Sequence, residues 1–215
     1  MTLSNNWQIQ PNELFNMGPI VPVLVINDVK DALPIAEALL AADVKVLEVT
    51  LRTASALDVI STIAKHLPEA VIGAGTVTNR EQLQRSIDAG SRFALSPGST
   101  ADLLQAGKES NIALIPGISS TSELMSAVDA GYDHMKFFPA EASGGVKAIQ
   151  SIGGPFPDVR FCPTGGINLN NVGNYLALPN VACCGGSWLV SDEIVNAKNW
   201  QEITRLAKEV LAHVK

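Results

Sequence analysis

Short runs of β-branched and apolar residues alternate along the chain with amphipathic stretches. The runs that predict strands cover residues 20–26, 44–50, 70–76, 92–96, 112–116, 134–138, 159–162 and 181–184. These eight runs recur at a spacing of roughly 22 residues, which is typical of a (β/α)8 TIM barrel. Their near-continuous apolar character indicates parallel strands that are covered on their outer face.

Helix signals fill the segments between these runs. Residues 28–42 carry a helical apolar stripe, and Ser120 with Glu123 forms a capping-box pattern. The residues interpreted as other helix N-caps are Asn79, Thr100, Asn168 and Asp192. An extra helix is predicted near residues 11–17. No linker or low-complexity segment interrupts the pattern, so we predict one TIM-barrel domain over residues 1–215 with an extra N-terminal helix.

A doubly wound sheet is the rival architecture. Such a sheet normally has fewer strands and often begins with a G-x-G-x-x-G fingerprint. Gly73 and Gly75 are not followed by a third glycine at the required place. The strand count therefore favours the barrel.

Composition and charge narrow the function classes. The chain of 215 residues has a net charge of −6, which argues against nucleic acid or an anionic membrane surface as its main partner. The apolar run at 20–26 is too short to span a bilayer, and residues 1–10 contain neither Lys nor Arg, so no signal peptide is expected. The cysteines are odd in number and lack metal-ligand spacing; they are Cys162, Cys183 and Cys184. We therefore expect a reduced cytoplasmic protein with no metal site.

Lys136 is the first residue that an apolar strand does not explain. It lies in the run 134–138 between hydrophobic and aromatic neighbours, although lysine is depleted in strands. Removal of a lysine from water disfavours the ammonium form, and a neutral amine can attack a ketone to form an imine. The alternative is a lysine whose ammonium group extends outward to solvent.

Glu48 and Thr76 lie at other strand ends, where barrel enzymes place their active sites. Glu48 shares one strand face with Val46 and Thr50 by the two-residue period. A carboxylate inside the barrel can shuttle protons near a lysine, whereas the alternative is a structural ion pair with Arg52. Thr76 follows two small glycines, which let a ligand approach the backbone, and its hydroxyl can donate to a carboxylate. An ordinary strand-ending threonine is the alternative.

Two glycine pairs follow the last two predicted strands. Gly165-Gly166 comes after the seventh run, and Gly185-Gly186 with Ser187 comes after the eighth. Barrel enzymes often bind phosphate with these two loops. A single Gly-Gly is usually a turn, but two pairs at these positions predict a phosphate site.

The sequence motifs resemble those of the 2-keto-3-deoxy-6-phosphogluconate (KDPG) aldolase family, which also includes 4-hydroxy-2-oxoglutarate (KHG) aldolases. The resemblance runs from about residue 18 to the C-terminus, and the segments that carry it are EVTLRT (48–53), GAGTV (73–77), SPG (96–98), IPG (115–117), KFFPAE (136–141), RFCPTGGI (160–167) and GGSWLV (185–190). It implies a class I aldolase that cleaves KDPG to pyruvate and glyceraldehyde 3-phosphate and also accepts KHG. Lys136 would be the Schiff-base lysine, and Glu48 would be the general acid and base.

The resemblance also implies the remaining site residues and the assembly. The residues that match the surroundings of the pyruvyl carboxylate are Arg52 and Thr76, those that line the pocket are Pro97, Phe138 and Thr164, and those of the phosphate loops are Gly165, Gly166, Gly186 and Ser187. The family is typically a cytoplasmic homotrimer without metal or cofactor, and its partner is a small phosphorylated 2-keto acid. A phosphogalactonate aldolase, a sugar-phosphate isomerase and a non-catalytic phosphate binder remain as alternatives.

Overall fold

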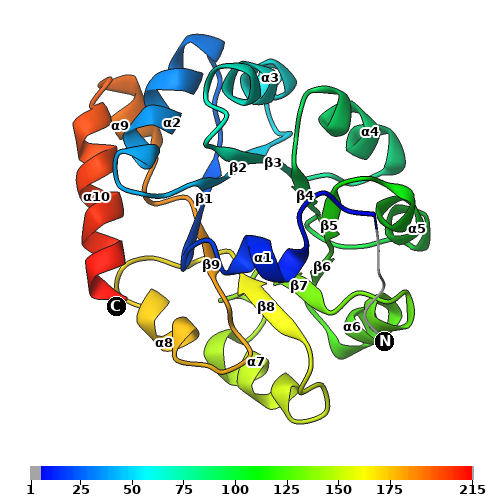
Figure 1. The fold of residues 1–215 in the computed structure, drawn as a ribbon. Coiled ribbons are helices and arrows are strands. Elements are labelled where there is room, and N and C mark those ends of the chain that lie inside the picture. Colours follow the sequence, from blue (N-terminus) through cyan, green and yellow to red (C-terminus); the bar gives the residue numbers. More distant parts are fainter. Residues whose placement is uncertain (1–5, 215) are drawn as a thin grey trace.

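The strands form two parallel sheets at the centre of a ring of helices (Figure 1). This computed structural model describes residues 6–214. The expectation that there is no signal peptide came from residues 1–10, of which 1–5 lie outside the described residues. The strands are β1 (Ile20–Leu24), β2 (Val46–Thr50), β3 (Val71–Gly75), β4 (Phe93–Leu95), β5 (Ala113–Ile115), β6 (Gly117–Ile118), β7 (His134–Phe137), β8 (Arg160–Pro163) and β9 (Cys184–Gly186). The helices are α1 (Pro11–Phe15), η1 (Val29–Asp31), α2 (Ala32–Leu40), α3 (Ala56–His66), α4 (Arg80–Asp88), α5 (Ala101–Glu109), α6 (Thr121–Asp129), α7 (Gly145–Gly153), α8 (Val172–Leu176), α9 (Asp192–Asn196) and α10 (Trp200–His213).

The prediction of a closed (β/α)8 TIM barrel is wrong. Six strands form one sheet in the order β5-β4-β3-β2-β1-β9, and three strands form a second sheet in the order β6-β7-β8. All the strand pairings in residues 6–214 are parallel, and the helices cover the outer side of both sheets as expected (Figure 1). The extra N-terminal helix is present as α1.

The two breaks between the sheets have local causes. Pro116 separates β5 from β6, and proline cannot donate a hydrogen bond to a neighbouring strand. Between β8 and β9 there are two isolated bridges, Phe161 to Val181 and Thr164 to Gly185. Their offsets are 20 residues (181 − 161) and 21 residues (185 − 164), so the register slips by one residue and no continuous ladder forms.

Alternation along each strand divides the apolar side chains between two cores. On β2, Leu47 and Val49 pack outward against the helices, whereas Val46 packs in the centre between the sheets. On β7, Met135 and Phe137 likewise pack outward. Because successive side chains point to opposite faces, Glu48 and Lys136 face the central space.

Helix α1 closes the N-terminal end of that central space. Leu14 and Phe15 of α1 are buried in the same cluster as Val21, Val46 and Val71 of the first three strands. The ring of Phe15 lies edge-on to His134 at the start of β7, with 5.1 Å between the ring centroids. The helix therefore leaves the opposite end, where the strands end, for chemistry.

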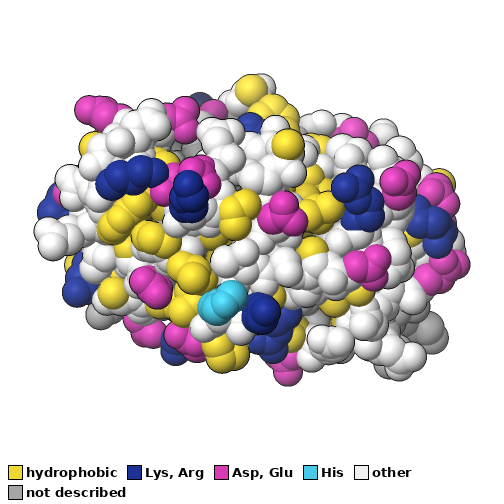
Figure 2. Space-filling view, turned by 90° about the horizontal axis from the view of Figure 1, so that it is seen from above, with side chains coloured by type: hydrophobic (Ala, Val, Ile, Leu, Met, Phe, Trp, Pro, Cys, Tyr) yellow, Lys and Arg dark blue, Asp and Glu magenta, His cyan; other side chains and the backbone are white. Residues whose placement is uncertain are grey.

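The surface carries no large block of one charge on the face drawn in Figure 2. Basic and acidic side chains are interspersed there among hydrophobic ones. Within residues 6–214, every helix is too short or too polar to cross a bilayer. The three cysteines are free and buried. Hydrogen bonding to Cys162, together with burial, holds the pKa of the Cys183 thiol well above its usual value, so this thiol is not a ready nucleophile.

Candidate active site

A buried ion pair joins the two sheets across the central space. Lys136 Nζ on β7 donates to Glu48 Oε1 on β2 at 2.9 Å, and the side chains are 5% and 1% exposed. The Lys136 ammonium also lies 5.5 Å from the ring centroid of Phe138. A lysine extending into solvent is therefore ruled out. A Glu48–Arg52 ion pair is also ruled out, because the second carboxylate oxygen of Glu48 has no hydrogen-bond partner and Arg52 Nε donates to Thr50.

Glycines of β3 make room for this arrangement. A side chain at Gly75 would place its Cβ 2.1 Å from Glu48 Oε1, and one at Gly73 would meet the Phe93 ring at 2.4 Å. The sequence interpretation assigned these small residues to the approach of a ligand. The structure shows that Gly75 admits the Glu48 carboxylate, while Gly73 admits an aromatic ring from β4.

Arg52 and Thr76 follow β2 and β3 at the same edge of the sheet. Arg52 is exposed, and its Nε donates to Thr50 Oγ1 at 3.3 Å. Thr76 has a φ of 60°, a left-handed conformation that is rare for a β-branched residue. Within residues 6–214, no group hydrogen-bonds to the Thr76 hydroxyl.

The turn after β8 presents free backbone amides. Gly165 and Gly166 have φ values of 102° and 78°. Their carbonyls are occupied, because Gly165 accepts from Glu141 N at 3.1 Å and Gly166 accepts from Asn171 Nδ2 at 3.0 Å. In the described part of the chain, the N–H groups of Gly166 and Ile167 have no acceptor, whereas Gly165 adjoins the bridge between Thr164 and Gly185. Successive free amides of this kind form an anion-binding concavity.

The second glycine pair is not in a loop. Gly185 and Gly186 lie within β9, and Ser187 is the exposed residue that follows. The predicted strand at 181–184 was therefore placed too early. A side chain at Gly185 would meet Thr164 Oγ1 at 2.3 Å, and one at Gly186 would enter the ring of Trp188. Here the glycines allow close packing between the strand ends.

The remaining predicted residues, Pro97, Phe138 and Thr164, follow β4, β7 and β8. Pro97 follows β4 and lies against Gly117 of β6, whose Cβ would be 2.4 Å from the Pro97 carbonyl carbon. Phe138 follows β7, and its ring lies 3.4 Å from the position that a Gly165 Cβ would occupy. Thr164 Oγ1 and Glu48 Oε2 are buried without a hydrogen-bond partner. Buried polar atoms are normally paired with protein, water or ligand, so both atoms retain unused hydrogen-bonding capacity.

Several supporting residues were missed by the sequence interpretation. Ser96 Oγ accepts from Gly117 N at 3.0 Å and so bridges the break at Pro116. Glu141, at the end of the KFFPAE segment, accepts a hydrogen bond from the Tyr175 hydroxyl on α8. No local signal predicts the second contact, because the two residues are 34 positions apart.

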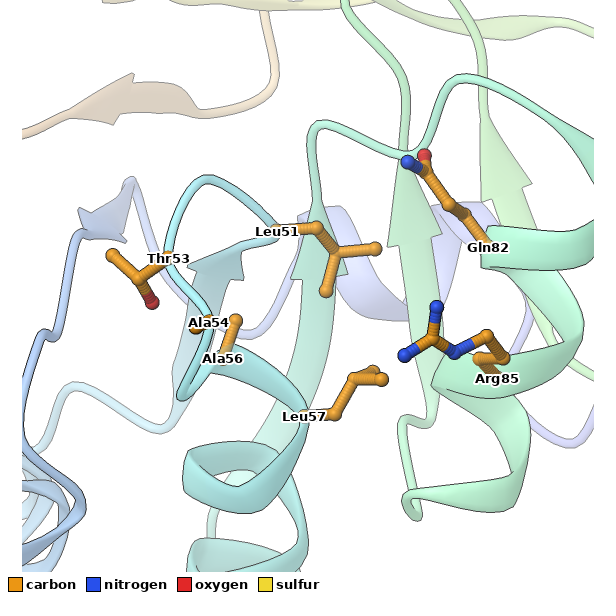
Figure 3. Close-up of a pocket in the computed structure, with 7 residues that line it drawn as sticks. All are labelled: Leu51, Thr53, Ala54, Ala56, Leu57, Gln82 and Arg85. Carbon is orange, nitrogen blue, oxygen red and sulfur yellow. The ribbon is translucent and has the colours of Figure 1, made fainter.

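A separate cleft lies outside this constellation. Figure 3 shows Gln82 and Arg85 of α4 facing Leu51 and Leu57 across a cleft of about 160 Å³. None of the predicted site residues lines it. Within residues 6–214, no group of three or more His, Cys, Asp or Glu side chains is placed to hold a metal ion. The prediction of metal-independent chemistry remains a prediction.

Comparisons with known proteins identify the family. The family model for KDPG and KHG aldolase matches residues 12–206. The 2-dehydro-3-deoxy-phosphogluconate aldolase of Pseudoalteromonas atlantica is 61% identical over 98% of both chains. The KHG/KDPG aldolase of Escherichia coli K12 is 53% identical over 98% of this chain and 99% of that protein.

A solved structure extends the likeness to the fold. The KDPG aldolase of Legionella pneumophila, captured with pyruvate as a covalent carbinolamine intermediate at low pH, superimposes with a TM-score of 0.94. It is 51% identical, and the match covers 95% of this chain and all of that one. The chain belongs to the KDPG and KHG aldolase family and is a carbon–carbon lyase of the class I aldolase type.

Proposed function

We propose that this aldolase cleaves KDPG to pyruvate and glyceraldehyde 3-phosphate, with Lys136 as the Schiff-base amine and Glu48 as the general acid and base. The observation that carries this proposal is the buried contact of 2.9 Å between Lys136 Nζ and Glu48 Oε1. A carboxylate at this distance can take a proton from the ammonium and leave a neutral amine. The carbinolamine captured in the Legionella relative supports the same class of chemistry.

The proposed reaction begins with imine formation. Glu48 takes one proton from the Lys136 ammonium, and the neutral amine attacks the C2 ketone to give a carbinolamine. Glu48 returns a proton to the carbinolamine hydroxyl, which leaves as water. The product is a protonated imine that can accept an electron pair.

Cleavage then uses this imine as the electron sink. Glu48, through a water, removes the proton of the C4 hydroxyl, and the C3–C4 bond breaks. Glyceraldehyde 3-phosphate leaves, and the electron pair forms an enamine on Lys136. Glu48 returns the proton at C3, and water hydrolyses the imine to release pyruvate and the free lysine. The water released in the first stage balances the water consumed in the last.

The two ends of the substrate have separate binding groups in this proposal. Arg52 and the free hydroxyl of Thr76 bind the pyruvyl carboxylate, while the pocket is lined by Pro97, Phe138 and Thr164. The residues that bind the phosphate are Gly165, Gly166, Gly186 and Ser187. Phosphate binding remote from the breaking bond orients the reacting carbons. The two free amides of the β8 turn, those of Gly166 and Ile167, support this assignment.

KHG is the second proposed substrate. It has the same 2-keto acid end but no phosphate, so it would form the same imine and lack the contacts of the β8 turn. The Escherichia coli relative, which is named for both activities, favours this addition. The ratio of the two activities therefore reports on how the enzyme treats the end of the substrate that carries the phosphate in KDPG.

A substrate panel tests the proposed function. Purified full-length protein is given KDPG, its galactonate epimer or KHG, and pyruvate release is followed with lactate dehydrogenase and NADH. We expect all the activity to depend on a 2-keto acid and the highest kcat/KM to be for KDPG. No pyruvate from KDPG, or a higher kcat/KM for the galactonate epimer, would overturn the assignment.

The remaining parts of the proposal concern the working form of the protein. We propose a single catalytic domain over residues 1–215 that acts in the cytoplasm as a homotrimer without cofactor or metal. Met125 and Val128 of α6 are 60% and 39% exposed, and exposed apolar side chains of this kind are suited to a subunit contact. Sedimentation equilibrium should give three times the chain mass of 22.7 kDa, whereas a monomer would contradict the assembly.

A further inference from the structure

We propose that Glu141 and Tyr175 are positioning residues that hold the Gly165–Gly166 turn in the shape that binds the phosphate of the substrate. This inference rests on the proposed function, because it concerns the same phosphate-binding turn. Neither residue is needed for imine formation, and neither is among the residues assigned to the site above. The argument comes from four contacts that converge on the turn.

The backbone before Glu141 is tied to the turn. Ala140 N donates to Thr164 O at 2.8 Å, and Glu141 N donates to Gly165 O at 3.1 Å. These bonds direct the two carbonyls toward the loop that follows β7. Asn171 Nδ2 holds the third carbonyl, that of Gly166, at 3.0 Å. With the carbonyls fixed, the unpaired amides of the turn are left to bind an anion.

The side chain of Glu141 packs directly on the turn. A Cβ at Gly166 would lie 2.6 Å from Glu141 Cγ and 2.7 Å from Glu141 Cβ. The aliphatic part of Glu141 therefore lies against Gly166 where a side chain would otherwise be. Gly166 has a φ of 78°, a conformation that glycine adopts without strain, and the contact limits the other conformations open to it.

The carboxylate of Glu141 is held by α8 and lies beside the start of α7. Tyr175 Oη on α8 donates to Glu141 Oε1. Gly145, the first residue of α7, has its would-be Cβ 3.4 Å from the same oxygen, and the positive end of a helix favours a carboxylate. Burial and the hydrogen bond to Glu141 raise the pKa of Tyr175 above its usual value, so the hydroxyl keeps its proton and remains a donor.

The contacts of the Glu141 carboxylate with Tyr175 and the start of α7 affect the electrostatics of the turn. A free carboxylate beside the turn would repel a phosphate dianion. With Tyr175 and the start of α7 as partners, Glu141 supports the turn with its methylene groups while its charge is held by these partners. Loss of either partner of the pair should therefore weaken phosphate binding without altering the Lys136–Glu48 pair.

The test compares substrates with and without phosphate. Glu141→Ala and Tyr175→Phe should raise KM for KDPG about tenfold or more, the loss expected for a hydrogen bond to a charged group. The kcat for KDPG and the kcat/KM for KHG should stay within about twofold. Glu141→Gln, which keeps the stem and an acceptor oxygen, should restore most of the KDPG affinity.

A matched control separates positioning from general packing. Tyr132, like Tyr175, is a buried tyrosine whose hydroxyl donates a hydrogen bond. Its acceptor is the backbone carbonyl of Leu104 at 2.7 Å. Tyr132→Phe makes the same chemical change away from the turn, so it should leave the ratio of KDPG to KHG activity as in the wild type. The double variant of Glu141 and Tyr175 should show a non-additive loss, because one removal already breaks the contact.

Direct binding keeps the inference separate from turnover. The dissociation constant of inorganic phosphate, measured by calorimetry on the intact protein, should rise about tenfold in Glu141→Ala and Tyr175→Phe but not in Tyr132→Phe. Equal phosphate affinity and equal substrate ratios in all four proteins would overturn the positioning role, as would absence of phosphate binding by the wild type. Failure of the proposed function would instead appear as wild-type protein that releases no pyruvate from KDPG.

Discussion

Lys136 Nζ and Glu48 Oε1 lie 2.9 Å apart although the residues are 88 positions apart in sequence. One belongs to the three-stranded sheet and the other to the six-stranded sheet, so the contact spans the boundary between the two sheets. Burial of both side chains makes this pair sensitive to loss of either partner, because an unpaired buried charge costs about 3–5 kcal/mol. The proposed chemistry therefore depends on an interaction that the fold must also stabilise.

Glu48→Gln tests proton transfer at this pair. The amide keeps the size of the side chain and an acceptor oxygen, but it cannot take a proton. We expect kcat for KDPG to fall by about 10²–10⁴-fold, with a folded protein by circular dichroism. An unchanged kcat would move the acid–base role to another group.

Gly75→Ala tests whether the position of the Glu48 carboxylate matters. The new methyl group would lie 2.1 Å from Glu48 Oε1, so the carboxylate must move away from Lys136. We expect kcat to fall at least tenfold, as for other small displacements of a catalytic group. Gly18→Ala is the control, because a Cβ there has no atom within 4 Å. Equal kcat values for the two variants would show that the position of the Glu48 carboxylate does not affect turnover.

Thr76→Gly should separate stability from substrate binding. Its left-handed φ of 60° costs a β-branched residue about 1–3 kcal/mol, which exceeds the entropic cost of glycine, about 0.5–1 kcal/mol. We expect a higher free energy of unfolding in urea and a higher KM for KDPG. Thr76→Ala should raise KM similarly without the full gain in stability, and a normal KM in both variants would remove Thr76 from the carboxylate site.

The start of α6 gives a prediction on pH. The Glu123 carboxylate accepts from Ser119 N at 2.7 Å and from Ser120 N at 2.9 Å, and hydrogen bonding from the Ser119 backbone is the main reason that its pKa is lowered. A carboxyl group whose pKa is lowered in the folded state stabilises the fold at pH values above the ordinary glutamate pKa. This stabilisation is lost as the pH falls through the pKa of the folded state.

Glu123→Ala should therefore cost about 1 kcal/mol in the free energy of unfolding at pH 7. The difference from wild type should shrink as pH falls from about 5 to 3, because protonation removes the same acceptor from the wild-type helix start. Urea titrations of both proteins across this range measure it. A difference that stays constant down to pH 3 would contradict the capping role.

The local sequence patterns predicted the individual strands and helices better than they predicted how the strands pair into sheets. Period-two alternation placed Glu48 on the strand face of Val46, which packs in the centre between the sheets, and the capping box at Ser120 and Glu123 is confirmed. The prediction of a closed barrel failed at Pro116. The apolar run at 112–116 was interpreted as one strand that includes Pro116, although proline has no N–H to donate. The eighth strand was placed too early for a different reason: the Gly185-Gly186 pair was interpreted as a loop because glycine often marks a turn.

The other features that the sequence did not predict are contacts between segments that lie far apart in the chain. The packing of Glu48 over Gly75 and the Glu141–Tyr175 contact depend on how the sheets and helices meet, and neither has a local signature. Helix starts show the same limit on a small scale. Asn79 and Thr100 are N-caps as predicted, whereas α8 and α9 are preceded by Asn171 and Ser191 in place of Asn168 and Asp192.

Borohydride trapping tests the imine at Lys136 most directly. Wild-type protein and Lys136→Arg are each incubated with pyruvate, reduced with borohydride, digested and analysed by mass spectrometry. A guanidinium is always protonated and cannot form an imine, so the account predicts a reduced pyruvate adduct on the wild-type Lys136 peptide and none in the variant. An active wild-type enzyme without that adduct, or with the adduct on another lysine, would contradict the account.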